Sequence, residues 1–182
     1  MVRLGGWLFP RRGVLPVPLL VLQWVFHARW PGYWALGLVL LLAGEGLRTW
    51  AAGHIGGVSR TRGDEVGPLV ASGPYRWLRN PLYLGNILLL TGLGLCSGLV
   101  WGGAWLALVL PYYAAIVRWE ESRLSASLGE PYSAYLSATP RWWPKLSRSL
   151  SETASWQVSR AIRSERSTWL ALALVLGLFC VR

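Results

Sequence analysis

The sequence predicts an all-α integral membrane protein with about four to five transmembrane helices. Of its 182 residues, 53% are apolar and only 14% are charged, whereas an average soluble domain has about 25% charged residues. The chain also contains 21 glycines and 13 tryptophans. Glycine is frequent in transmembrane helices, and tryptophan gathers where hydrocarbon meets lipid headgroups. This composition excludes an ordinary soluble domain, and we expect a single membrane domain over residues 1–182.

The first two predicted spans occupy residues 14–27 and 33–52. The first is apolar but short, and two prolines stand near its start. The second carries Glu45 and Arg48 near its end. Because side chains three residues apart share one face of a helix, we expect these two to form an ion pair.

The strongest feature is the uncharged stretch over residues 80–117. A single helix of that length would reach about 57 Å, nearly twice the roughly 30 Å hydrocarbon core of a bilayer. The stretch must therefore fold back on itself. We predict a helical hairpin over residues 82–117, with spans at 82–95 and 99–117 and its corner at residues 96–98.

The last apolar run, residues 168–181, is a possible terminal span, although it is short.

The net charge of +10 is explained by membrane topology, because the basic residues fall between apolar runs. With a cytoplasmic N-terminus, 16 of the 18 basic residues face the cytoplasm, as the positive-inside rule requires. We therefore expect the inner membrane of a bacterium, a cytoplasmic N-terminus and no nucleic-acid partner. Two polar stretches also face the cytoplasm, the connection over 53–80 and the segment over 118–150.

The connection over 53–80 ends in a helix start. Asn80 is a preferred N-cap, and Pro81 suits the first helical position. The free backbone N–H groups, together with Arg76 and Arg79, would form an electropositive pocket able to hold a carboxylate or phosphate. An ordinary capped helix whose arginines reach the headgroups is the alternative.

The second polar segment begins with Glu120 and Glu121, directly after the fourth predicted span. Adjacent helical side chains point about 100° apart, so one carboxylate can face a ligand while the other pairs with an arginine. Arg141 either binds lipid headgroups or holds an anionic group of a substrate. Solvated acids at a helix end are the alternative for the two glutamates. We expect a cytosolic cofactor pocket between the 53–80 connection and residues 118–145.

At these two segments the chain resembles the integral-membrane isoprenylcysteine carboxyl methyltransferase and phospholipid N-methyltransferase superfamily. The matching pieces are GPYRWLRNPLYLGN at residues 73–86 and EESRLSASLGEPYSAYLSATPRWWP at residues 120–144. The resemblance covers roughly residues 45–145. It implies S-adenosylmethionine as the methyl donor and a lipid or lipidated small molecule from the bilayer as the acceptor. Membrane lipids are the only other expected partners, and no obligate protein partner is expected.

The resemblance also implies which residues form the site. The residues implied to bind the cofactor are Tyr75, Arg76, Arg79, Asn80, Pro81, Tyr83, Leu84, Gly85, Gly92, Gly94, Glu120 and Glu121. Arg141 matches the arginine of the family's C-terminal motif, and Glu121 and Tyr83 could assist the deprotonation of an amine acceptor. These three are the predicted catalytic residues, and no metal is predicted. Asn80 departs from the pattern, because the carboxyl methyltransferases usually have His there. Asn can form the hydrogen bond but cannot titrate.

Methyl transfer from a sulfonium mainly requires that donor and acceptor are aligned and that water is excluded. It needs no nucleophilic side chain, and His27 and His54 lie far from the motifs, where we expect an interfacial and a solvated side chain, respectively. The predicted function is therefore methylation of a membrane-embedded phospholipid amine or prenylcysteine-type carboxylate. The alternatives are an NADPH-dependent membrane reductase of the sterol reductase type and a non-catalytic membrane scaffold.

Overall fold

The computed structural model describes the whole chain except residues 1, 27–32, 56–66, 146–154 and 182. In chain order, its elements are α1 (Val2–Leu8), η1 (Phe9–Arg11), α2 (Val17–Phe26), α3 (Trp34–Ile55), η3 (Gly73–Arg76), α4 (Pro81–Leu95), α5 (Leu99–Leu128), α6 (Glu130–Ala138) and α7 (Val158–Val181). The described residues contain no strand. The all-α prediction is confirmed for this part of the chain.

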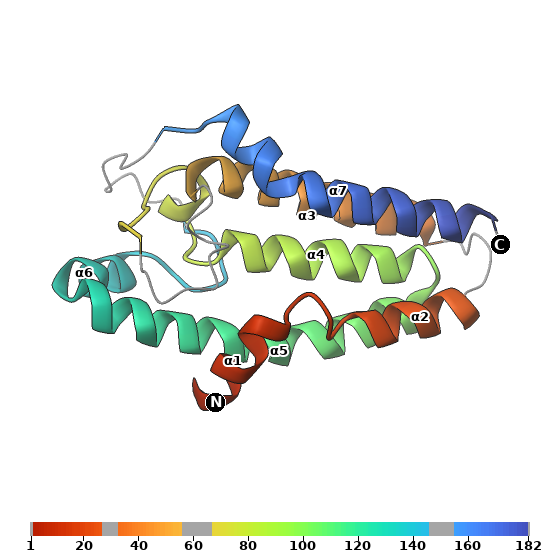
Figure 1. Ribbon diagram of the computed structural model, residues 1–182, viewed down its shortest axis with the longest axis horizontal. Helices are drawn as coiled ribbons and strands as arrows, with labels where there is room; N and C mark the ends of the chain where they lie inside the picture. Colours follow the sequence, from red (N-terminus) through yellow and green to blue (C-terminus); the bar gives the residue numbers. More distant parts are fainter. Residues whose placement is uncertain (1, 27–32, 56–66, 146–154, 182) are drawn as a thin grey trace.

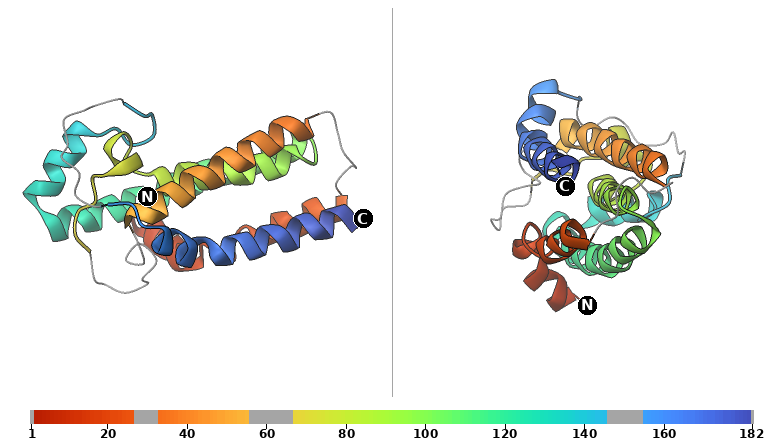
Figure 2. Two further views of the ribbon diagram at one scale, coloured as in Figure 1. Left: turned by 90° about the horizontal axis from the view of Figure 1, so that it is seen from above. Right: turned by 90° about the vertical axis from the view of Figure 1, so that its right-hand side faces the viewer.

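Four long helices, α3, α4, α5 and α7, run side by side along the long axis of the molecule (Figure 1). Successive helices run in opposite directions, and α2 lies along the same bundle (Figure 2). Helix α6 and η3 lie together at one end of the bundle, and the C-terminus lies at the other (Figure 1). The two polar segments that the sequence singled out therefore meet at the same end.

Two helices, α3 and α5, are long and apolar enough to cross a membrane. Helices α2 and α4 are apolar but shorter; at 1.5 Å per residue they reach only about 15 and 22 Å, against roughly 30 Å of hydrocarbon. The outer faces of α3 and α7 nevertheless expose large apolar side chains, among them Val39, Leu42, Leu170 and Leu174. Such surfaces suit contact with lipid. The larger number of spans stays a prediction.

Three helix boundaries differ from the prediction for local reasons. Helix α2 starts at Val17 rather than at residue 14 because Pro18, its second residue, has no backbone N–H to donate to the carbonyl of Val14 and is tolerated only in the first turn. Helix α5 continues through both glutamates to Leu128, where Gly129, with φ of 60°, ends it. The run over 168–181 is the second half of the longer α7, since residues 158–167 contain good helix formers and neither glycine nor proline.

Helices α3 and α4 approach each other at glycines. A Cβ atom on Gly44 would lie 2.6 Å from the carbonyl oxygen of Gly85, and one on Gly92 would lie 2.5 Å from that of Gly37. No side chain fits at either point. Gly94 meets α5 in the same way, because a Cβ there would lie 2.6 Å from the carbonyl oxygen of Trp101. The glycines of α4 thus serve the packing of the bundle.

Helix α2 is fastened to the predicted hairpin by a buried glutamine. Gln23 is fully buried, and its Nε2 donates to the carbonyl of Leu93 and to the hydroxyl of Ser97, both at 2.9 Å. Its Oε1 accepts from Trp105 Nε1 at 2.5 Å. The predicted corner at residues 96–98 lies between the end of α4 and the start of α5, and Gly98 in it has a φ of 125°. These contacts hold α2 beside α4 and α5.

Helix α7 is attached to α3 through an ion cluster. Arg48 pairs with Glu45 at 3.3 Å, which confirms the predicted pair, and also with Glu165 of α7. Its Nη2 donates to Thr168 at 2.9 Å, and Trp169 Nε1 donates to Glu45 at 2.6 Å. One guanidinium and two carboxylates therefore join the two helices.

Candidate active site

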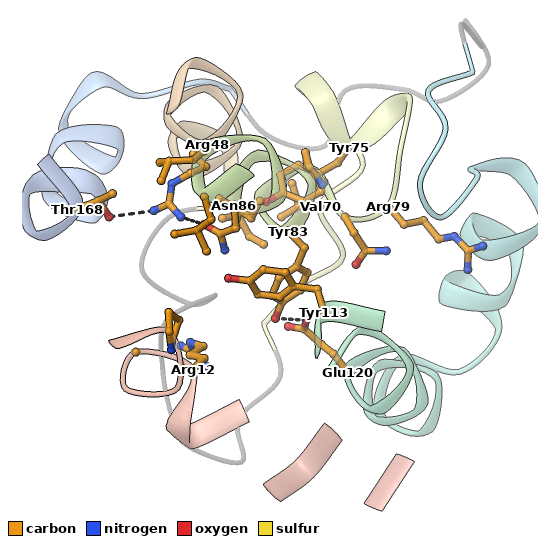
Figure 3. Close-up of a pocket in the computed structure, with 18 of the residues that line it drawn as sticks. Arg12, Arg48, Val70, Tyr75, Arg79, Tyr83, Asn86, Tyr113, Glu120 and Thr168 are labelled. Atoms are coloured by element: carbon orange, nitrogen blue, oxygen red, sulfur yellow. Dashed lines mark hydrogen bonds between the residues drawn. The ribbon is translucent and has the colours of Figure 1, made fainter. Parts of the chain in front are cut away.

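A cavity of ≈ 750 Å³ lies between α2, α3, α4, α5 and α7 (Figure 3). Cavities that bind small molecules usually measure about 300–1,000 Å³. The connection before α4 contributes Tyr75 and Arg79 to its wall, and α5 contributes Glu120. Both sequence segments therefore line one cavity, which also has walls from α2 and α7.

Glu120 and Tyr83 form a pair on the cavity wall (Figure 3). The Tyr83 hydroxyl, in the first turn of α4, donates to Glu120 Oε2 at 2.8 Å. The ring of Tyr113 lies 5.2 Å from that of Tyr83, centroid to centroid. The hydrogen bond from Tyr83 thus fixes the position of the Glu120 carboxylate on the cavity wall.

Glu121 points away from Glu120 and joins two arginines. Its carboxylate is 3.2 Å from Arg79 Nη1 and 2.6 Å from Arg141 Nη2, and it also accepts from Arg141 Nε. The hydrogen bonds from Arg141 to Glu121 raise the pKa of Arg141, so this guanidinium stays charged. One of the two adjacent glutamates thus pairs with arginines, as expected, whereas the role of Glu120 toward a ligand stays a prediction.

Backbone hydrogen bonds join the two polar segments. The Arg79 amide donates to the carbonyl of Pro140 at 2.9 Å, and the Lys145 amide donates to that of Trp77 at 3.0 Å. The Tyr135 hydroxyl donates to the carbonyl of Tyr75 at 2.8 Å. The segments around η3 and after α6 therefore form one unit beside the cavity.

Asn80 stands at the N-cap position of α4, but its side chain does not cap the helix. The side-chain Nδ2 donates instead to the carbonyl of Arg141 at 3.3 Å. The predicted helix start, with Asn80 before Pro81, is confirmed, although the Asn80 side chain does not bond to a backbone amide of the first turn. Asn80 thus adds a further link between the two segments.

The structure brings seven of the predicted site residues to the cavity. These are Tyr75, Arg79, Asn80, Pro81, Tyr83, Glu120 and Glu121. The other six do not line it: Arg76, Leu84, Gly85, Gly92, Gly94 and Arg141. Arg141 adjoins the cavity through Glu121, whereas the space beside Gly85 is filled by α3. The roles of these thirteen residues in cofactor binding and catalysis stay predictions.

His54 is not the solvated loop residue that the sequence suggested. Because α3 extends to Ile55, the ring is buried at the end of that helix, and its Nδ1 lies 3.2 Å from Ser72 Oγ. His27 lies outside the described residues. His54 thus helps to place the chain just before η3.

Sequence reasoning missed several polar residues of the cavity wall, among them Arg12, Arg48, Asn86 and Thr168. Arg48 could have been found, since a charge within an apolar span is costly and usually has a function. Its partner Asn86 lies two turns into α4, inside the matched GPYRWLRNPLYLGN stretch. No comparable signal exists for Arg12, because basic residues before an apolar run also serve topology.

The model of the phospholipid methyltransferase family matches residues 33–130. The chain is 34% identical over 122 residues to the cobalt-zinc-cadmium resistance protein CzcN of Cupriavidus metallidurans, covering 66% of this chain and 56% of that protein. It is 32% identical over 158 residues to the nickel-cobalt-cadmium resistance protein NccN of Alcaligenes xylosoxydans xylosoxydans, covering 83% of this chain and 68% of that protein. The chain thus spans little more than half the length of the first of these relatives. No solved structure matches it.

Proposed function

The chain belongs to the phospholipid methyltransferase family, and from this premise we propose that it is an S-adenosylmethionine-dependent methyltransferase. Its acceptor is a lipid-like molecule embedded in the membrane. The protein is an integral protein of a bacterial inner membrane, with its N-terminus and both polar segments at the cytoplasmic face. The observation that carries the proposal is the cavity, where the two polar segments meet beside the Tyr83–Glu120 pair.

The cavity wall suits the methyl donor. Two buried polar atoms there, the Tyr75 hydroxyl and Arg79 Nε, have no hydrogen-bond partner in the part of the chain that the structure describes. Burial raises the pKa of Tyr75 well above its ordinary value, so its hydroxyl stays protonated and can donate. The donor offers a carboxylate and ring nitrogens as acceptors. We assign Tyr75 and Arg79 to donor binding, together with the helix start at Asn80.

When bound, S-adenosylmethionine supplies a methyl group that is already activated by a positively charged sulfur. The residues of the chain then have to align the partners and exclude water. For an amine acceptor, Glu120 accepts the proton of the amine, and Tyr83 orients its carboxylate. Glu121 already binds two guanidiniums, so we assign it and Arg141 to positioning the polar segments.

Both relatives are named as metal resistance proteins. Among the described residues, no three His, Cys, Asp or Glu side chains cluster in a way that could hold a metal ion. From the family match, we propose that any part this chain plays in such resistance passes through a methylated membrane component. The methyl transfer itself is what an experiment should detect first.

The test incubates the purified protein with methyl-labelled S-adenosylmethionine and bacterial inner membranes, followed by extraction of the lipids. We expect label in one lipid class and, for Glu120→Gln, a loss of rate of about a hundredfold. Glu130→Gln is the matched control, because Glu130 is an exposed acid at the start of α6. Unlabelled lipids with protein that binds the donor would favour the scaffold. Quenching of nicotinamide fluorescence on titration with NADPH would favour the reductase.

A further inference from the structure

Arg12 lies on the cavity wall between η1 and α2, on the opposite side from Tyr83 and Glu120 (Figure 3). Its guanidinium stacks 3.9 Å above the centre of the Phe9 ring, and its Nη1 donates to the Phe9 carbonyl at 3.5 Å. Within the described ranges it forms no ion pair. The side chain is therefore held in place by an aromatic ring while its charge is not neutralised by a carboxylate.

The other two arginines of the cavity wall differ from Arg12 in this respect. Arg48 pairs with two carboxylates, Glu45 and Glu165. Arg79 pairs with Glu121. A guanidinium without an acidic partner, at the wall of a partly enclosed cavity, attracts an anionic group and can bind it through two parallel hydrogen bonds.

Arg12 and Glu120 face each other without touching. Both side chains line the same cavity, Figure 3 labels them at separate places on its wall, and no ion pair joins them in the described part of the chain. A ligand group that enters this cavity would meet a cation on one side and the proposed proton acceptor on the other. This arrangement suits an acceptor whose reacting atom and anionic group are only a few bonds apart.

Deeper in the bundle the cavity wall becomes apolar. Leu20 of α2, Leu89 of α4, and Leu172 and Val175 of α7 line it there, and they pack around one buried cluster. Apolar walls of this kind favour a hydrocarbon chain because they remove it from water. The charged and apolar parts together fit a molecule with an anionic head and an apolar chain.

We propose that Arg12 binds the anionic group of the lipid-like acceptor, a phosphate or a carboxylate, and so determines which acceptors the enzyme accepts. The proposal rests on the proposed function, since it assigns a residue to the acceptor of that reaction. It extends the site beyond the region of the family match, because Arg12 precedes residue 33.

The test measures equilibrium binding of three lipids to the full-length protein in detergent. The probes are dioleoylphosphatidylethanolamine with a phosphate, N-acetyl-S-farnesylcysteine with a carboxylate, and uncharged dioleoylglycerol. For Arg12→Gln we expect a loss of affinity of about tenfold to a hundredfold for the charged probe that the wild type binds. Binding of dioleoylglycerol should not change, and Arg12→Lys should lose less than Arg12→Gln. Which charged probe binds tells phosphate from carboxylate.

Arg11→Gln is the matched control. Arg11 is the neighbouring residue, but it is exposed, its Nη1 donates to the Trp7 carbonyl at 2.8 Å, and it does not line the cavity. Equal affinities of wild type and both Arg12 variants for the charged probes would overturn the proposal, as would a wild type that binds neither. Binding of S-adenosylhomocysteine is measured in parallel. Its absence from the wild type would contradict the proposed function, whereas normal binding with unchanged lipid affinities would contradict the role of Arg12 alone.

Discussion

Helix α3 holds its two neighbours by different chemistry. Against α4 it uses Gly37 and Gly44, where the two backbones approach so closely that no side chain fits. Against α7 it uses Arg48 and Glu45, which form the ion cluster with Glu165. The first contact relies on close packing, as is usual between helices in membranes. The second relies on charges that stabilise only when each has its partner.

The two contacts also differ in whether they lie within the residues that the family model matches. The glycine contact lies entirely within residues 33–130, which the family model matches, whereas α7 lies outside that range. Helix α7 nevertheless supplies Thr168 and Leu172 to the cavity wall. The difference indicates that the contact between α3 and α4 depends on shape, while α7, which completes the cavity wall, is attached by charge.

Arg48→Met should have the largest effect. It removes the guanidinium that pairs with the carboxylates of Glu45 and Glu165, and breaking a buried ion pair costs about 3–5 kcal/mol. Titration of the purified protein with sodium dodecyl sulfate in mixed micelles, followed by tryptophan fluorescence, measures the free energy of unfolding. Arg11→Met, at an exposed arginine, is the control. A loss below about 1 kcal/mol would show that α7 is held mainly by its apolar contacts.

Gly44→Ala should have the second-largest effect and acts on the other contact. The new methyl group would lie 2.6 Å from the Gly85 carbonyl oxygen and the Leu89 amide nitrogen, and overpacking of this kind costs about 1–3 kcal/mol. The same titration measures it. If α3 and α4 tolerated the methyl group at no cost, the contact would not depend on close approach of the backbones.

Trp169→Phe should weaken the α7 contact slightly. It removes the hydrogen bond from the indole to Glu45 while keeping an aromatic ring, and one hydrogen bond contributes about 0.5–1.5 kcal/mol. We expect a correspondingly small drop in the free energy of unfolding, well below that of Arg48→Met. A drop of equal size would place the main attachment of α7 at Trp169 instead of Arg48.

Gly46→Ala should have the smallest effect and the opposite sign. Gly46 lies on α3 only two residues from Gly44, yet a Cβ atom there meets nothing within 4 Å. Replacing a helical glycine by alanine at an open position stabilises by about 0.5–1 kcal/mol. Destabilisation by this variant in thermal unfolding would mean that the outer face of α3 is covered in the membrane.

The sequence predicted the parts of the fold that depend on nearby residues. The hairpin over 82–117 followed from the length of the uncharged stretch, and the pair of Glu45 with Arg48 followed from their spacing along one helix. The contact of Arg48 with Glu165 could not be predicted, because the two residues are 117 positions apart. Glu165 lies in an arginine-rich stretch that looks like solvated surface.

The same distinction holds for the site. The meeting of residues 73–86 with residues 120–144 was predicted from the resemblance, and the structure places both at one cavity. The placement of Arg12 depends on how α1 packs against α5, where Gly5 meets the backbone of Ala115. Helix packing of this kind depends on the shape of both partners, and a single sequence does not reveal it.

Calorimetric binding of S-adenosylhomocysteine to the detergent-purified protein tests the proposed methyl-donor site most directly. We expect one molecule to bind per chain, and Tyr75→Phe to weaken binding by about three- to tenfold, because it removes the buried hydroxyl that can donate to the ligand. Tyr33→Phe, at an exposed tyrosine before α3, should bind like the wild type. Folded wild-type protein that binds no S-adenosylhomocysteine would contradict the assignment of this cavity to a methyl donor.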